Sequence, residues 1–81
     1  SETPLNQYKM SLLSQLSPRE TQVLHQLSLG GRNKDIALNL HLSVSTVKRH
    51  LQNIYGKLQV GSRTEALILF NQHTSAALQE G

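Results

Sequence analysis

The feature that most constrains this chain is a succession of helix starts, each followed by apolar residues at helical spacing. In L-S-P-R-E, Ser17 can cap a helix, Pro18 suits its first position and Glu20 can reach back to the Ser17 amide. Ser62 and Glu65 repeat this capping box further along the chain. No stretch alternates strictly between apolar and polar residues for long enough to indicate a strand. The chain is therefore predicted to be all-α.

The caps divide the chain into a weak first helix and four firmer ones. The first has Thr3 as N-cap and Pro4 at its first position, or is a linker that orders only against a neighbour. Its apolar face comprises Leu5, Tyr8, Leu12 and Leu13. The second helix stops at Gly30-Gly31, the third is a two-turn helix with Asn33 as N-cap, the fourth is capped by Ser43, and the last ends near Gln72.

The inward positions of the four firmer helices follow from their periodicity. They are Val23, Leu24, Leu27, Ile36, Ala37, Leu40, Val47, Leu51, Ile54, Leu58, Ala66, Leu67 and Phe70. A chain of 81 residues has one core at most, so we expect one domain at 16–73, a linker or N-terminal helix at 1–15 and a flexible C-terminal tail at 74–81. The short third helix, a three-residue turn and the longer fourth helix predict a helix-turn-helix.

Composition argues against several classes of function. The chain has no Cys, and its four His residues have no metal-ligand spacing, so we expect no metal and no cofactor. No Ser has recognisable His and Asp partners, and we expect no enzyme. The apolar run 66–70 is too short to span a membrane and no signal peptide opens the chain, so a cytoplasmic protein without membrane contact is expected.

Positive charge is concentrated in one segment. Between Arg32 and Arg63 there are six cations and one acid, Asp35, and residues 36–64 contain neither Asp nor Glu. A basic segment is typical of a nucleic-acid-binding surface, although a solvated Lys/Arg face has the same composition. Because ordinary exposed helices usually mix Glu with Lys, the missing acids favour binding to nucleic acid.

The fourth helix separates its side chains into opposite faces. At about 100° per residue, Ser45, Lys48, Arg49 and Gln52 lie within about 100° of one another, almost opposite the inward stripe. Arg, Lys and Gln are the side chains that donate to guanine and adenine edges, so this outward stripe predicts base reading. Thr46, His50 and Lys57 lie on a flank suited to the sugar-phosphate backbone. The alternatives are a half-buried imidazole for His50 and a hydroxyl serving its own helix for Thr46.

The combination L-S-P-R-E, N-K-D-I-A, S-T-V-K-x-H, N-I-Y-x-K-L-x-V and S-R-T-E-A resembles the LuxR-type helix-turn-helix domain at the C-terminus of NarL/FixJ-type bacterial response regulators. The resemblance covers residues 16–66. It implies a compact four-helix fold, with room for an extra N-terminal linker helix. It also implies sequence-specific binding to double-stranded DNA, with the recognition helix, about 44–58, in the major groove and two copies on paired half-sites.

The resemblance also implies roles for individual residues. Base reading falls to Lys48, Arg49 and Gln52, and backbone contacts fall to Asn33, Lys34, Ser45, Thr46, His50 and Lys57. Arg32 replaces the family's usual small polar residue and would add a phosphate contact. Dimer contact on DNA falls to Ile68, Leu69 and Gln72. Glu20 and Arg63 are expected to pair across the domain, unless each serves only its own helix end.

The role of Gly56, the competing functions and the partners remain open at this point. Gly56, on the outward face of the fourth helix, either permits close approach of DNA or is tolerated at a cost of roughly 1 kcal/mol. A helix-turn-helix that docks on a protein, a sigma-factor region and the effector domain of a small-molecule-sensing LuxR-type regulator are the competing functions. An upstream regulatory domain is expected to be absent from this chain, and RNA polymerase is a further candidate partner.

Overall fold

The computed structural model describes the backbone of residues 4–80 and the side chains of residues 4–73. The described residues form five helices and no strand: α1 (Pro4–Ser14), α2 (Pro18–Ser28), α3 (Asn33–Leu40), α4 (Val44–Leu58) and α5 (Arg63–Glu80). The prediction of an all-α domain with an additional N-terminal helix is therefore confirmed.

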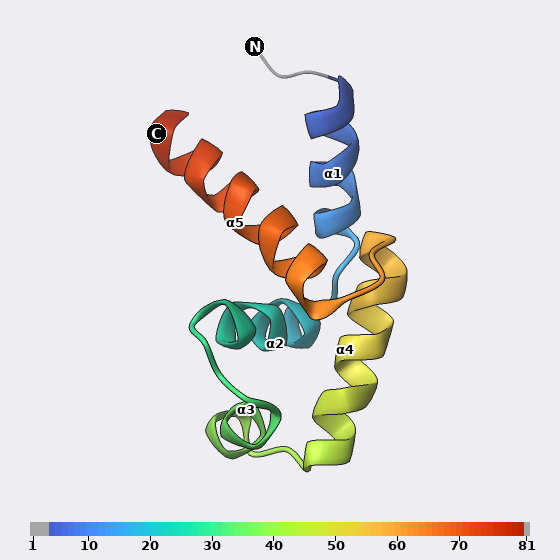
Figure 1. Cartoon of the computed structure of the whole chain (residues 1–81), viewed down its shortest axis with the longest axis vertical. Coiled ribbons are helices and arrows are strands. Elements are labelled where there is room, and N and C mark those ends of the chain that lie inside the picture. Colours follow the sequence, from blue (N-terminus) through green and yellow to red (C-terminus); the bar gives the residue numbers. More distant parts are fainter. Residues whose placement is uncertain (1–3, 81) are drawn as a thin grey trace.

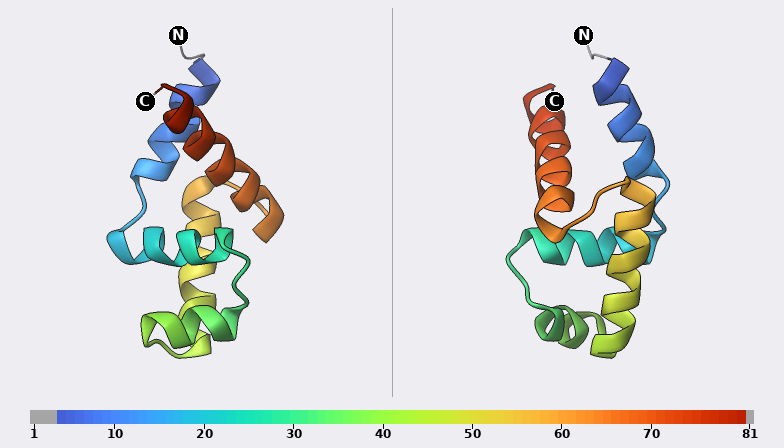
Figure 2. Two further views of the ribbon diagram at one scale, coloured as in Figure 1. Left: turned by 90° about the vertical axis from the view of Figure 1, so that its left-hand side faces the viewer. Right: turned by 45° about the vertical axis from the view of Figure 1, so that its right-hand side comes forward.

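Helix α4 runs along the half of the molecule that holds α2 and α3, and the other four helices contact it (Figure 1). Helix α2 crosses its middle, and α3 lies beside its N-terminal half. Helices α1 and α5 pack at its C-terminal end and diverge from each other (Figure 2). The turn between α3 and α4 therefore lies at the end of the molecule opposite both ends of the described chain.

The predicted caps form as hydrogen bonds. Ser17 Oγ accepts from the Glu20 N–H at 3.1 Å, and Glu20 Oε1 accepts from the Ser17 N–H at 2.9 Å, which completes the capping box of α2. Ser43 Oγ accepts from the Thr46 N–H at 3.1 Å and fixes the start of α4. Helix α2 ends where Gly30 adopts a φ of 88°, in the left-handed region that Gly occupies without steric cost.

The second capping box forms only in part. Ser62 Oγ accepts from the Glu65 N–H at 3.2 Å, as expected. The Glu65 carboxylate, however, accepts from the Gly61 N–H at 2.8 Å instead of the Ser62 N–H. The hydroxyl cap of α5 is therefore confirmed, while its carboxylate holds the preceding turn.

The core is the set of inward positions that periodicity predicted, with additions. Buried side chains are Leu12, Val23, Leu24, Leu27, Ile36, Ala37, Val47, Leu51, Ile54, Leu58, Ala66 and Leu69. Leu40, Leu67 and Phe70 are partly buried against this core. On α1 the predicted face holds only in part, because Leu5 and Tyr8 stay 60% and 49% exposed.

Two helix boundaries differ from the sequence-based prediction. The N-cap of α3 is Arg32, with an extended backbone, and Asn33 is the first helical residue. Asp35 explains the shift, because its carboxylate accepts from the Arg32 N–H at 3.2 Å and so caps the helix from within. Helix α5 continues to Glu80 instead of ending near Gln72, so most of the expected tail is helical. The expected N-cap Thr3 and the terminal Gly81 lie outside the described residues.

Candidate nucleic-acid interface

The outward face of α4 carries the three side chains predicted to read bases. Lys48, Arg49 and Gln52 are exposed, whereas Val47 and Leu51 on the opposite side are 0% and 5% exposed. Within the described side chains, the three outward residues make no hydrogen bond or ion pair to the protein. Their donors are therefore available to a ligand in the solvent, and no carboxylate on α4 competes for them.

The side chains of α4 predicted to contact the DNA backbone are more engaged than the three predicted to read bases. Thr46 and His50 are half-buried, and Ser45 is exposed. The Ser43 hydroxyl lies 3.2 Å from the Ser45 hydroxyl and 2.8 Å from the Thr46 hydroxyl. The alternative that Thr46 serves its own helix is thus confirmed, although a hydroxyl with both donor and acceptor capacity can also meet a phosphate.

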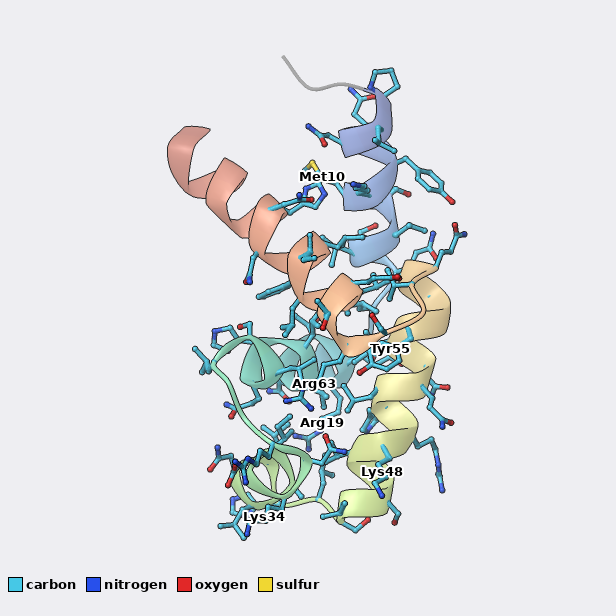
Figure 3. The ribbon with its side chains drawn as sticks, viewed as in Figure 1. Met10, Arg19, Lys34, Lys48, Tyr55 and Arg63 are labelled. Carbon is cyan, nitrogen blue, oxygen red and sulfur yellow. The ribbon has the colours of Figure 1, made fainter. Side chains whose placement is uncertain are left out.

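The start of α3 lies next to α4 and adds two exposed cations. Arg32 and Lys34 are exposed, and Lys34 lies with Lys48 toward the α3–α4 end of the molecule (Figure 3). Asn33 is half-buried, and its Oδ1 accepts from Arg63 Nη1 at 3.5 Å. The first N–H groups of α3 also point out of the helix start, where the helix dipole favours an anion.

Lys57 is occupied by an internal partner. Its Nζ donates to Glu20 Oε1 at 2.7 Å, and the Glu20 residue is only 5% exposed. The hydrogen bond from Lys57, followed by that from the Ser17 backbone, lowers the pKa of Glu20 below its ordinary value. The expected pair of Glu20 and Arg63 is therefore wrong. An ammonium at the end of α4 reaches the carboxylate instead.

Arg63 faces the start of α3. Its Nη2 donates to the Gly31 carbonyl at 2.5 Å, and a hollow of about 220 Å³ opens beside it. The hollow is lined by Asn33, Lys48, Leu51, Gln52, Tyr55 and Arg63. Burial raises the pKa of Tyr55, and the positive charge of Arg63 opposes that shift. The sequence did not assign Tyr55 or Arg63 to this region. For Arg63 the sequence held one signal. It is a cation at the first position of a helix, where the positive end of the helix dipole is unfavourable for it, so a partner outside its own helix was to be expected.

The three residues expected at a dimer contact separate into two groups. Ile68 is 52% exposed and Gln72 is also exposed, so both are available to a second chain. Leu69 is 7% exposed and belongs to the core of its own chain, so its side chain is not available for the dimer contact expected of it. The reason is α1, which packs against α5 and covers a second side of that helix. A groove of about 290 Å³ between them is lined by Leu5, Tyr8, Ile68 and Gln72, among others.

The described part of the chain gives no sign of other kinds of site. Over residues 4–80 there is no helix with the length and apolarity needed to cross a membrane. Among the described side chains, no group of three His, Asp or Glu residues gathers in a way that could hold a metal ion.

The sequence of this helix-turn-helix chain matches a known family. The model of the family described as bacterial regulatory proteins, luxR family, matches residues 14–70, which include α2, α3, α4 and the first part of α5. The chain belongs to the luxR family of bacterial regulatory proteins. As a member of it, the chain is a DNA-binding helix-turn-helix domain of a transcription regulator.

Individual relatives agree with the family model. The luxR-family chain is 49% identical over 63 residues to the nitrate/nitrite response regulator protein NarP of Escherichia coli, covering 78% of this chain and 29% of the relative. It is 41% identical over 59 residues to the putative HTH-type transcriptional regulator YhjB of Escherichia coli, covering 73% and 30%. It is 38% identical over 65 residues to the response regulator protein VraR of Staphylococcus aureus, covering 80% and 31%. The chain thus spans less than a third of the length of these curated relatives.

Proposed function

We propose that this luxR-family domain binds double-stranded DNA by inserting α4 into the major groove, where Lys48, Arg49 and Gln52 donate to base edges. The observation that carries this assignment is the outward face of α4, with free donors, no acid and a buried stripe on its opposite side. The major groove is wide enough to admit an α-helix and presents a distinct pattern of acceptors for each base pair. Each good bidentate contact discriminates against a wrong base by about 1–3 kcal/mol.

The surrounding residues fix the position of α4 on the duplex. Arg32, Asn33 and Lys34 would meet one phosphate strand from the start of α3, where the helix dipole adds to their effect. Ser45, Thr46 and His50 would meet the strand beside the flank of α4. Such contacts supply affinity for any sequence, whereas the base contacts supply preference.

Two copies would bind paired half-sites through α5. Ile68 supplies an exposed apolar side chain, and Gln72 supplies an exposed amide one turn further along α5. This part of α5 lies away from the α3–α4 end that is proposed to face DNA. A two-fold dimer places its recognition helices about one helical turn of DNA apart, and so requires a repeated half-site.

The whole protein would be a cytoplasmic two-component response regulator. NarP and VraR are described as response regulators, and the chain covers 29% and 31% of their lengths. An upstream regulatory domain would then control the exposure of this domain, and RNA polymerase is its expected protein partner at a promoter. A small-molecule-sensing LuxR-type regulator is the alternative, and the sequence of the upstream domain decides between the two.

Fluorescence anisotropy with a labelled 25-base-pair duplex at several salt concentrations tests the proposed function. Arg32, Lys34, Lys48 and Arg49 are the cations placed to neutralise phosphate, so log K should fall linearly with log salt, with a slope of about −2 to −4 per bound protomer. Absence of binding would contradict DNA binding and favour a protein-docking role. Binding that does not respond to salt would contradict phosphate contacts by these cations.

A further inference from the structure

Arg63 occupies a position that its own helix does not favour. It is the first residue of α5, where the positive end of the helix dipole repels a cation. It is also half-buried, and its guanidinium makes its hydrogen bonds to residues more than 29 positions away in the chain. Neither its own helix nor exposure to solvent explains this placement. The explanation lies in the contacts of Arg63 with the start of α3.

These contacts hold the connection between α2 and α3. Arg63 Nη2 donates to the Gly31 carbonyl at 2.5 Å, and Nη1 donates to Asn33 Oδ1 at 3.5 Å. The Cα of Gly31 is also packed closely, because a Cβ there would lie 3.1 Å from the Gln26 carbonyl oxygen and 3.3 Å from Ile36 Cγ1. Gly31 is thus clamped by Gln26 of α2, by Ile36 of α3 and by the guanidinium that comes from α5.

The clamped segment is the one proposed to meet phosphate. Arg32, Asn33 and Lys34 follow Gly31 directly, so the placement of Gly31 sets where their N–H groups and side chains lie. The hollow beside Arg63 is also lined by Lys48 and Gln52, which belong to the outward face of α4. Figure 3 shows Arg63 between the start of α5 and α3, with Tyr55 of α4 beside it.

We infer that Arg63 is a positioning residue for DNA binding: it fixes the start of α3 relative to the recognition helix and links that start to α5. The inference rests on the proposed function, since it concerns how the same interface is held. A planar guanidinium with several donors can serve the Gly31 carbonyl and the Asn33 amide at once, whereas a Lys ammonium is a single point charge. Charge alone is therefore not sufficient at this position.

The experiment compares Arg63→Met, Arg63→Lys, Asn33→Ala and the double variant Arg63→Met/Asn33→Ala in the 81-residue chain. Arg19→Met is the matched control, because it removes the same charge from an exposed residue whose hydrogen bond among the described side chains goes to Gln22. Binding to a labelled 25-base-pair duplex is measured by anisotropy, and the amide shifts of residues 31–34 are measured by NMR without DNA. Thermal melts establish that each variant is folded.

We expect Arg63→Met to weaken binding about fivefold to twentyfold and Arg63→Lys to restore little of it, because hydrogen bonds to a charged group are among the stronger ones. The double variant should lose less affinity than the product of the two single losses, because both variants remove the hydrogen bond between Arg63 and Asn33. Amides 31–34 should shift in both Arg63 variants and stay in place in Arg19→Met. If Arg63→Met does not fold, the same measurements of binding and of amides 31–34 are made on Arg63→Lys and Asn33→Ala.

Three results would overturn the inference. Arg63→Lys could bind like the wild-type chain, in which case only charge matters. The losses of Arg63→Met and Asn33→Ala could multiply, which would make the two residues independent. Arg63→Met could leave binding unchanged. Each of these leaves DNA binding by the wild-type chain intact, whereas failure of the proposed function would appear as a wild-type chain that binds no duplex.

Discussion

Replacing Lys57 with Met removes the ammonium that faces Glu20 and keeps most of the aliphatic stem. The Glu20 carboxylate would then stay in a place that is 5% exposed, with the Ser17 N–H as its remaining hydrogen-bond donor among the described residues. Breaking a fully buried ion pair costs about 3–5 kcal/mol, and breaking an exposed pair costs about 0–1 kcal/mol. Since the Lys57 side chain is 41% exposed and that of Glu20 only 6%, we expect a loss between these limits, about 1–3 kcal/mol of unfolding free energy.

The assay is urea or thermal unfolding of Lys57→Met, Glu20→Gln and the double variant. For a domain of this size, a loss of about 2 kcal/mol lowers Tm by roughly 8–16 °C. The double variant should recover part of the loss of Lys57→Met, because a neutral amide costs less to bury than an unpaired carboxylate. A double-mutant cycle then gives the coupling between the two side chains directly.

The same variant decides whether Lys57 also contacts phosphate, as the sequence predicted. A phosphate contact would contribute about 0.9 to the slope of log K against log salt. Because Glu20 already neutralises this ammonium, we expect Lys57→Met to leave the slope unchanged once stability is accounted for. Unchanged stability together with a slope reduced by about one would refute the reasoning and return Lys57 to the DNA-contacting set.

Three further predictions concern stability and assembly. The folded-state pKa of Glu20 is lowered, so its contribution to stability is present above its ordinary pKa of 4.5 and is lost as pH falls through the folded value. Thermal melts should show this loss below about pH 4.5, and Glu20→Gln should flatten it; an equally steep loss in that variant would contradict the assignment. A Cβ on Gly56 would meet nothing within 4 Å, so Gly56→Ala should stabilise the chain by about 0.5–1 kcal/mol in urea unfolding; destabilisation would show that the site is not tolerant. Ile68→Glu should keep Tm within a few degrees but reduce cooperative binding to a duplex with two half-sites, measured by gel shift, and unchanged cooperativity would remove α5 from the dimer contact.

The helices and most of the core could be predicted because both depend on local pattern. Val47, Leu51, Ile54 and Leu58 recur at helical spacing, and all four are buried on one side of α4. The Ser17 and Ser43 caps depend on residues within three positions of each other, so they could be predicted as well. The exposure of Lys48, Arg49 and Gln52 on the outward face of α4 follows from the same periodicity. This part of the candidate site could therefore be predicted without knowing how the helices pack.

The remaining features depend on contacts that the local pattern does not encode. Glu20 can take either of two distant cations, and only the packing of α2 on α4 and α5 selects Lys57 over Arg63. Leu69 is buried because α1 covers a second side of α5, which a helical wheel of α5 alone does not show. The extension of α5 to Glu80 accords with the Ala, Leu, Gln and Glu at its end, whose intrinsic helix propensity is high although their apolar periodicity fades.

Base reading by α4 is tested most directly by the ratio of affinities for a selected duplex and a scrambled duplex. Selection from random duplexes first provides the preferred site of the wild-type chain, and anisotropy then gives both affinities for the wild type and for Arg49→Ala. We expect Arg49→Ala to lose about 1–3 kcal/mol on the selected duplex and much less on the scrambled one, so that the ratio falls about fivefold to 150-fold. A ratio equal to that of the wild type would contradict base reading by this face of α4.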